Sequence, residues 1–200
     1  MATDLAAEER CPGPVLYDTA GQVQDLAWLE ATYGAVSWQC AEAHPDAEYL
    51  FRLTELRASC GPAVIVANVK DEDGGPLADR AVIRYWPGAP ALPYYDPPAS
   101  RWTDLGVVGW TSAAGDVGFG LGEGDYYFPE TGAGVTEIYI ADYDGPSDLV
   151  EGLGMLAATD HCTLFPTWHR IPKEDVIPPT ATPGPTSEPP VDGEGLYRIE

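Results

Sequence analysis

A run of β-branched residues, Ala63-Val-Ile-Val-Ala-Asn-Val69, begins the stretch that decides the fold of this chain of 200 residues. The turn-forming sequence Asp71-Glu-Asp-Gly-Gly-Pro76 follows it, and Ala81-Val-Ile-Arg-Tyr-Trp86 comes next. β-Branched and aromatic residues favour a pleated sheet, and glycine adopts the positive φ of tight turns at low cost. The three pieces therefore predict a strand, a hairpin turn and a return strand.

Similar short segments recur on both sides of this stretch, separated by turns rich in Gly, Pro and Asp. We expect strands at 49–57, 107–111, 116–120, 126–128, 136–141 and 162–169, and loops at 87–100 and 142–154. Short strands at regular spacing with turn signals between them are typical of a β-sandwich or barrel. The predicted fold class is therefore mainly β, with an antiparallel β-sandwich as the architecture.

The two ends of the chain differ from this β-rich middle. Leu26, Leu29 and Tyr33 recur at helical spacing before Gly34, so a helix is expected over 18–33. The C-terminal stretch is rich in Pro and Thr and has no apolar face that would offset the entropy lost on ordering. We therefore expect an N-terminal arm and helix (1–47) packed on the sandwich, the sandwich itself (48–175), and a disordered Pro/Thr-rich tail (176–200).

The charge of the chain argues against some classes of partner, and its cysteines allow two oxidation states. The chain has 32 acidic and 10 basic residues, a net charge of −22, which repels nucleic acid and anionic membrane surfaces. No apolar run reaches the roughly 18 residues needed to span a membrane, so membrane insertion is not expected. The four cysteines contain no C-x-x-C pair, and their even number allows either two disulfides or buried free thiols.

The turn residues between Val64 and Phe128 carry a family resemblance. In order they are Asp71, Asp73-Gly-Gly-Pro-Leu77, Ala81-Val-Ile-Arg-Tyr85, Gly109-Trp-Thr111, Gly115, Val117, Phe119 and Gly124-Asp-Tyr126. This order of strand, D-x-x-G-x-P-L, strand, T-x-x-x-G, strand, G-x-Y resembles the prealbumin-like surface domains, which include carboxypeptidase-regulatory-like and bacterial Ig-like repeats. The resemblance covers about a third of the chain. It implies a β-sandwich used for adhesion, spacing or glycan contact, usually without catalysis.

Aromatic residues in and near the Pro-rich insertion form the first candidate site. They are Trp86, Tyr94, Tyr95 and Trp102, with Trp110 beside them and with Tyr126 and Tyr127 on a later strand. Sugar rings stack on flat aromatic side chains, and clustered aromatic residues on loops often mark binding surfaces. The predicted ligand is therefore a glycan or cell-wall polymer. The alternative is that Trp110 and some of the tyrosines fill the core.

An acidic loop forms the second candidate site. Asp142, Asp144 and Asp148 bring three carboxylates within seven residues, and calcium prefers several oxygen ligands from one short loop. The loop lacks the remaining ligands of an EF-hand. Ordinary turn formation is the alternative, with Asp148 capping a short helix at 149–153. No cofactor is expected, and calcium at this loop is the alternative.

The sequence contains no motif of an enzyme. Neither Gly-x-Ser-x-Gly nor a phosphate-binding Gly-Lys-Ser/Thr loop occurs. We therefore expect a non-catalytic extracellular or cell-surface module that binds glycan or cell-wall material. One alternative is a structural subunit that assembles with copies of itself into a surface layer or filament. Another is an accessory domain of a hydrolase whose catalytic part lies outside this chain.

Overall fold

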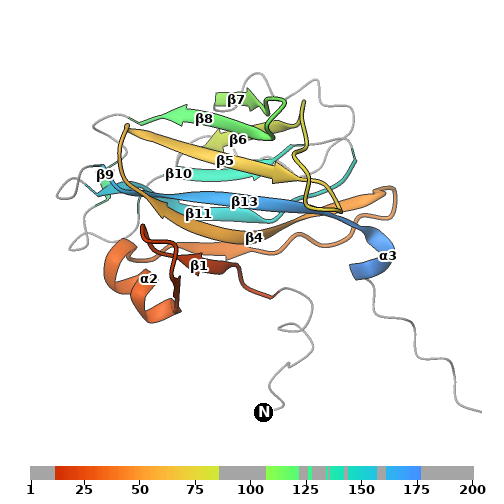
Figure 1. Cartoon of the computed structure of the whole chain (residues 1–200). Helices are drawn as coiled ribbons and strands as arrows, with labels where there is room; N and C mark the ends of the chain where they lie inside the picture. The colour runs from red at the N-terminus through yellow and green to blue at the C-terminus, as the bar shows by residue number, and fades with distance from the viewer. Residues whose placement is uncertain are drawn as a thin grey trace, which may run out of the picture.

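The computed structural model describes residues 12–85, 107–121, 126–127, 134, 136–141, 144–156 and 161–176, and it is mainly β, as predicted. Two large sheets pack face to face, and the six-stranded sheet lies in front of the five-stranded sheet in Figure 1. Helix α2 (Leu26–Tyr33) lies near one end of the sheets, and the short helix α3 (Lys173–Val176) lies at the other.

The strand order is β2-β1-β4-β13-β5-β8 in the six-stranded sheet, β3-β11-β10-β6-β7 in the five-stranded sheet and β12-β9 in a third, two-stranded sheet. The first sheet consists of β1 (Val15–Tyr17), β2 (Val23–Gln24), β4 (Tyr49–Ser59), β5 (Val64–Lys70), β8 (Asp116–Gly120) and β13 (Thr163–Pro172). The second consists of β3 (Ser37–Gln39), β6 (Ala81–Tyr85), β7 (Val107–Trp110), β10 (Thr136–Ile140) and β11 (Leu149–Leu153). The third consists of β9 (Tyr126–Tyr127) and β12 (Met155–Leu156).

The six-stranded sheet is mixed rather than antiparallel, which corrects the predicted architecture, whereas every pair in the five-stranded sheet is antiparallel as predicted. β13 lies between β4 and β5, antiparallel to the first and parallel to the second. Because β4 and β5 run in opposite directions, a strand inserted between them must be parallel to one of the two. β1 also pairs with β4 in parallel. A pattern of short strands predicts that a sheet forms, but it does not predict which strand enters between two others.

One apolar core joins the two large sheets. The six-stranded sheet contributes Phe51, Ile65 and Trp168, and the five-stranded sheet contributes Ile138 and Val150, all fully or almost fully buried. Trp168 also donates a hydrogen bond from Nε1 to the carbonyl oxygen of Asp148, at 2.9 Å. A buried indole N–H needs such a partner, so this bond fixes the largest core side chain in one orientation.

The N-terminal helix is shorter than predicted. It begins at Leu26 with Asp25 as the N-cap, and Gly34 ends it at φ 69°, as expected. Residues 18–24, predicted to be helical, instead form a turn and β2. The carboxylate of Asp18 accepts hydrogen bonds from the N–H groups of Ala20 and Gln22, and the bond from Gln22 is the main cause of its lowered pKa. Asp commonly binds nearby backbone in this way, which competes with helix formation.

The predicted hairpin between β5 and β6 is wrong. The turn at 71–76 is present, but β6 pairs with β7 and β10 in the other sheet and not with β5. β7 and β8 are likewise consecutive in the chain and belong to different sheets. The stretch that decides the fold therefore crosses between the sheets twice, once on each side of the β6–β7 pair.

Two further predictions need revision. Residues 149–153 form β11, so the loop predicted over 142–154 and the short helix suggested at its end are both incorrect there. Gly152 has φ 77°, a bend that breaks the alternating pattern by which strands are recognised. The segment predicted as an N-terminal arm and helix also contributes β1 and β2 to one large sheet and β3 to the other.

A disulfide joins the neighbouring ends of β4 and β13. It links Cys60 to Cys162, which are 102 residues apart in the chain. Cys40 is disulfide-bonded as well, and no cysteine in the described part of the chain is free. Of the two alternatives left open by the sequence, the structure therefore shows disulfides.

Candidate functional site

The structure describes only part of the predicted aromatic site. Trp86, Tyr94, Tyr95 and Trp102 lie outside the described residues. The backbones of Tyr126 and Tyr127 form β9, which pairs in parallel with β12. Glycan binding by these residues therefore stays a prediction.

Trp110 is the one member of the aromatic group whose side chain the structure places. It is 60% exposed on β7, at the edge of the five-stranded sheet, and pairs with Ala81 of β6. The sequence left open whether Trp110 fills the core, and because Trp110 is exposed it does not. An exposed Trp on a fixed strand is available for contact, whereas a Trp on an unsupported loop would lose conformational freedom on binding.

Three of the family-like turn residues, Asp71, Thr111 and Gly115, lie at one corner of the fold. The hydroxyl of Thr111 accepts a hydrogen bond from the N–H of Arg80 and donates one to the carbonyl oxygen of Leu77, at 2.9 and 2.7 Å. The Asp71 carboxylate accepts hydrogen bonds from the N–H groups of Asp73 and Gly75. These bonds satisfy buried and turn polar groups where the chain leaves one sheet for the other.

Gly115 completes the same corner. Its φ is 76°, and a Cβ at this position would lie 2.6 Å from the carbonyl oxygen of Val69. Its own carbonyl oxygen accepts the N–H of Val69 at 2.7 Å. Thr111, Asp71 and Gly115 thus stabilise the crossing between the sheets.

Two of the three predicted calcium ligands bind arginine side chains. Asp148 is almost completely buried, and its carboxylate accepts hydrogen bonds from Arg52 (2.7 Å) and from the N–H groups of Ala41 and Leu53. Asp144 pairs with Arg80 at 2.9 Å and with Arg170 at 3.4 Å. Asp142 lies outside the described residues. Within the described part, no group of three or more His, Cys, Asp or Glu is arranged to hold a metal ion.

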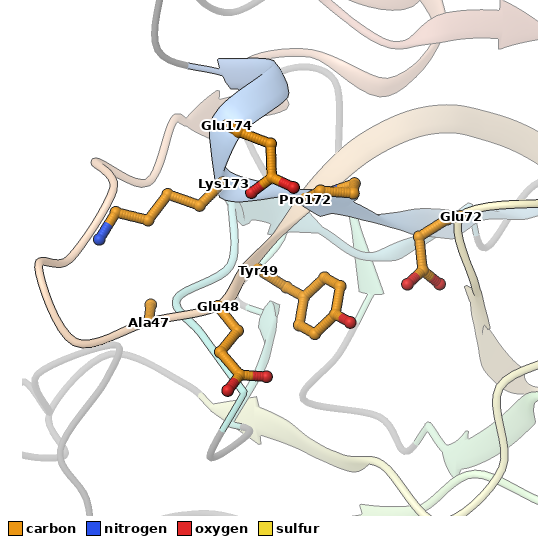
Figure 2. Close-up of a pocket in the computed structure, with 7 residues that line it drawn as sticks. All are labelled: Ala47, Glu48, Tyr49, Glu72, Pro172, Lys173 and Glu174. Carbon is orange, nitrogen blue, oxygen red and sulfur yellow. The ribbon is translucent and has the colours of Figure 1, made fainter.

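An open pocket lies at the end of the sheets that carries α3. It has a volume of about 310 Å³ and is lined by Ala47, Glu48, Tyr49, Glu72, Pro172, Lys173 and Glu174. We call it the end pocket. Figure 2 shows the ring of Tyr49 in its middle, with the carboxylates of Glu48, Glu72 and Glu174 around the ring. In the same view the amine of Lys173 points away from the ring, and it donates a hydrogen bond to the carbonyl oxygen of Pro45.

Backbone pairing holds the end pocket rigidly. Tyr49 begins β4 and pairs with Pro172 at the end of β13. The N–H groups of Glu48 and Tyr49 both donate to the carbonyl oxygen of Asp144, and the N–H of Lys173 donates to that of Glu48. Three segments far apart in the sequence therefore fix the position of the aromatic ring.

Arg170 supports the ring of Tyr49 and balances part of the acidic charge. Its guanidinium carbon lies 4.4 Å from the ring centroid, and its Nη2 is 2.9 Å from Glu72. The pKa of Glu72 is lowered, first by a hydrogen bond from the backbone N–H of Glu72 itself and then by the hydrogen bond from the side chain of Arg170. Burial works against the charged form of Arg170. The carboxylates of Glu72 and Asp144 outweigh burial and raise the pKa of Arg170 above its usual value.

Sequence reasoning missed the end pocket. The paired strands β4 and β13 were both predicted, but their register was not, and the register brings Tyr49 beside Pro172. Glu72 was interpreted as part of a hairpin turn, a role that gives no indication of Arg170. The sequence offers one weak signal, an acidic residue directly before an aromatic residue at the start of a strand.

Comparison with known proteins identifies no relative. No family model, no curated protein and no solved structure matches the chain. A search of the described helices for a possible membrane span finds none with the length and apolar character required.

Proposed function

We propose that this chain is a non-catalytic extracellular or cell-surface module with a prealbumin-like β-sandwich, and that it binds glycan or cell-wall polymer through an aromatic surface. The observation that carries the proposal is Trp110, 60% exposed at a sheet edge. It follows in the sequence the Pro-rich segment in and near which Trp86, Tyr94, Tyr95 and Trp102 lie. Large aromatic residues exposed on a rigid frame are typical anchors of binding surfaces.

Two features support the proposed location and the proposed fold. Disulfides persist in oxidising compartments, which favours a secreted or surface location. Thr111 and Leu77, two of the family-like turn residues, bond to each other at a crossing between the two packed sheets, which supports a sandwich. The prealbumin-like assignment itself rests on the turn pattern.

A polysaccharide pull-down tests the proposed function. We expect the wild-type chain to be retained by at least one insoluble glycan, and Trp110→Ala or Trp102→Ala to weaken retention about tenfold, the loss typical of an aromatic anchor. Val23→Ala is the matched control, because Val23 is 67% exposed but lies on β2, an edge strand of the other large sheet. Retention by no glycan, or equal losses in all three variants, would refute the proposal.

Self-assembly is a second candidate function, and one observation favours it. Three of the four large apolar side chains exposed in the described residues, Val15, Val23 and Leu26, lie within 12 residues of one another. Exposed apolar residues near a sheet edge offer a contact for another copy of the chain. Light scattering over a concentration series tests this, and a strict monomer at high concentration would count against it. The third alternative, an accessory domain of a hydrolase, stays a prediction that a longer reading frame would decide.

A further inference from the structure

We propose that the end pocket is a binding site for a cationic side chain, the lysine of a basic peptide or protein partner. This site is separate from the aromatic surface proposed for glycan and does not depend on it. Its lining combines one aromatic ring, three carboxylates and a single ammonium group. Carboxylates and the faces of a tyrosine ring both attract cations, and the guanidinium of Arg170 covers one face of the Tyr49 ring, 4.4 Å from its centroid.

The charges in the pocket are unequally compensated. Glu72 is paired with Arg170 at 2.9 Å. The exposed carboxylates of Glu48 and Glu174 make no ion pair with any described residue. The lining ammonium group, that of Lys173, is turned toward Pro45 and away from Tyr49 (Figure 2). Among the described residues, no cationic group is therefore paired with Glu48 or Glu174, and an incoming ammonium group would supply such a partner.

The pocket also suits a lysine in size and rigidity. A volume of about 310 Å³ is at the small end of ligand sites, which suits one side chain better than a larger molecule. Tyr49 is already fixed by its pairing with Pro172 and by Arg170, so its ring need not be ordered on binding. The net charge of −22 also attracts cationic partners over a longer range and raises their association rate.

Titration with a minimal peptide followed by NMR tests this site. The probe is an acetylated and amidated hexapeptide of five glycines and one lysine, and the control peptide carries norleucine in place of lysine. We expect the lysine peptide to shift the amide signals of Glu48, Tyr49, Lys173 and Glu174 in a saturable manner. Added salt should weaken binding. The norleucine peptide should cause no shift. Equal shifts with both peptides, or shifts confined to other residues, would overturn the proposal.

Charge-matched variants separate the pocket from the general field of an acidic protein. Glu48→Gln and Glu174→Gln should each weaken binding of the lysine peptide several-fold. Glu30→Gln removes the same charge from an exposed position on α2, near the opposite end of the sheets, and should leave affinity unchanged (Figure 1). An equal loss in all three variants would show that only the net charge matters. Because the glycan assay uses different residues, failure of either proposal leaves the other intact.

Discussion

Asp144 and Asp148 lie four residues apart, and each binds arginine, but their surroundings differ sharply. The side chain of Asp148 is 2% exposed, and its donors are Arg52 and two backbone N–H groups. The side chain of Asp144 is 34% exposed, and its partners Arg80 and Arg170 lie at the rim of the sheets. Water can replace the partners of Asp144 but has little access to Arg52, whose side chain is 11% exposed. The carboxylate of Asp148 should therefore contribute more to the stability of the fold than that of Asp144.

The buried pair also connects the two large sheets. Asp148 precedes β11 of the five-stranded sheet, whereas Arg52 and Leu53 belong to β4 of the six-stranded sheet. Its backbone N–H donates to the carbonyl oxygen of Phe51 at 2.9 Å. Asp148 thus joins the two large sheets at one edge by side-chain and backbone bonds together.

The largest predicted effect is that of Asp148→Asn. The change leaves the Arg52 guanidinium buried beside a neutral amide, and breaking a buried pair typically costs about 3–5 kcal/mol. We expect a loss of this size in the free energy of unfolding, measured by urea denaturation. The control is Asp144→Asn, which should cost less than about 1 kcal/mol because its partners are accessible to water. Similar losses in both variants would contradict the comparison.

The sequence predicted local features of this region well and its long-range partners poorly. The strand over 49–57 and the closing strand over 162–169 are confirmed as β4 and β13, since alternating and β-branched patterns depend on near neighbours. Asp148 was predicted as a calcium ligand or a helix cap, because an acidic residue beside Gly and Pro is common in such loops. Its partner Arg52 is 96 residues away, and no local pattern indicates a contact across that distance.

The sequence did not predict the crossing between the sheets, for a related reason. The residues at 71–76 have the composition of a hairpin turn, and the local bonds of Asp71 are those that this composition predicts. Whether the next strand returns to β5 or joins the other sheet depends on the strand that occupies the place beside β5. The antiparallel neighbour of β5 is β8, and the place on its other side is taken by β13, almost a hundred residues later in the chain. The prediction of the turn was therefore confirmed and that of the hairpin was wrong.

Arg170→Met removes several interactions around the exposed Asp144 at once. The variant keeps an apolar stem near Tyr49 but removes the cation over the ring and the ion pairs to Glu72 and Asp144. Because a cation–π contact and an exposed ion pair each contribute about 0.5–1 kcal/mol, we expect a loss of about 1–2 kcal/mol in urea denaturation. Arg170→Lys keeps the charge without the planar fork and should fall between wild type and Arg170→Met. A loss as large as that of Asp148→Asn would refute the distinction.

Glu72→Gln examines one exposed pair by its dependence on pH. The pKa of Glu72 is lowered in the folded protein, so its contribution is present above the ordinary value of 4.5 and is lost as pH falls below that value. We expect the wild type to be more stable than the variant by less than about 1 kcal/mol at neutral pH. The difference should shrink as pH falls below 4.5 and vanish once the carboxylate is protonated in both the folded and the unfolded state. A difference that persists in acid would show that Glu72 acts by packing and not by charge.

The smallest predicted effect has the opposite sign, because Glu137 lies beside a like charge instead of an arginine. Burial, and then the carboxylate of Glu151, raise the pKa of Glu137 above 4.5. Between the ordinary and the raised pKa, the folded state binds more protons than the unfolded state, so stability falls as pH rises through that window. Glu137→Gln removes this loss and should stabilise the protein by a few tenths of a kcal/mol at neutral pH, as expected for relieving a pair of like charges on adjacent strands. Below pH 4.5 the gain should disappear, since wild-type Glu137 is then protonated in both states.

Urea denaturation at neutral and acidic pH measures both values. A variant that is less stable than wild type at neutral pH would show that the Glu137 carboxylate makes favourable contacts that outweigh its burial and its repulsion by Glu151.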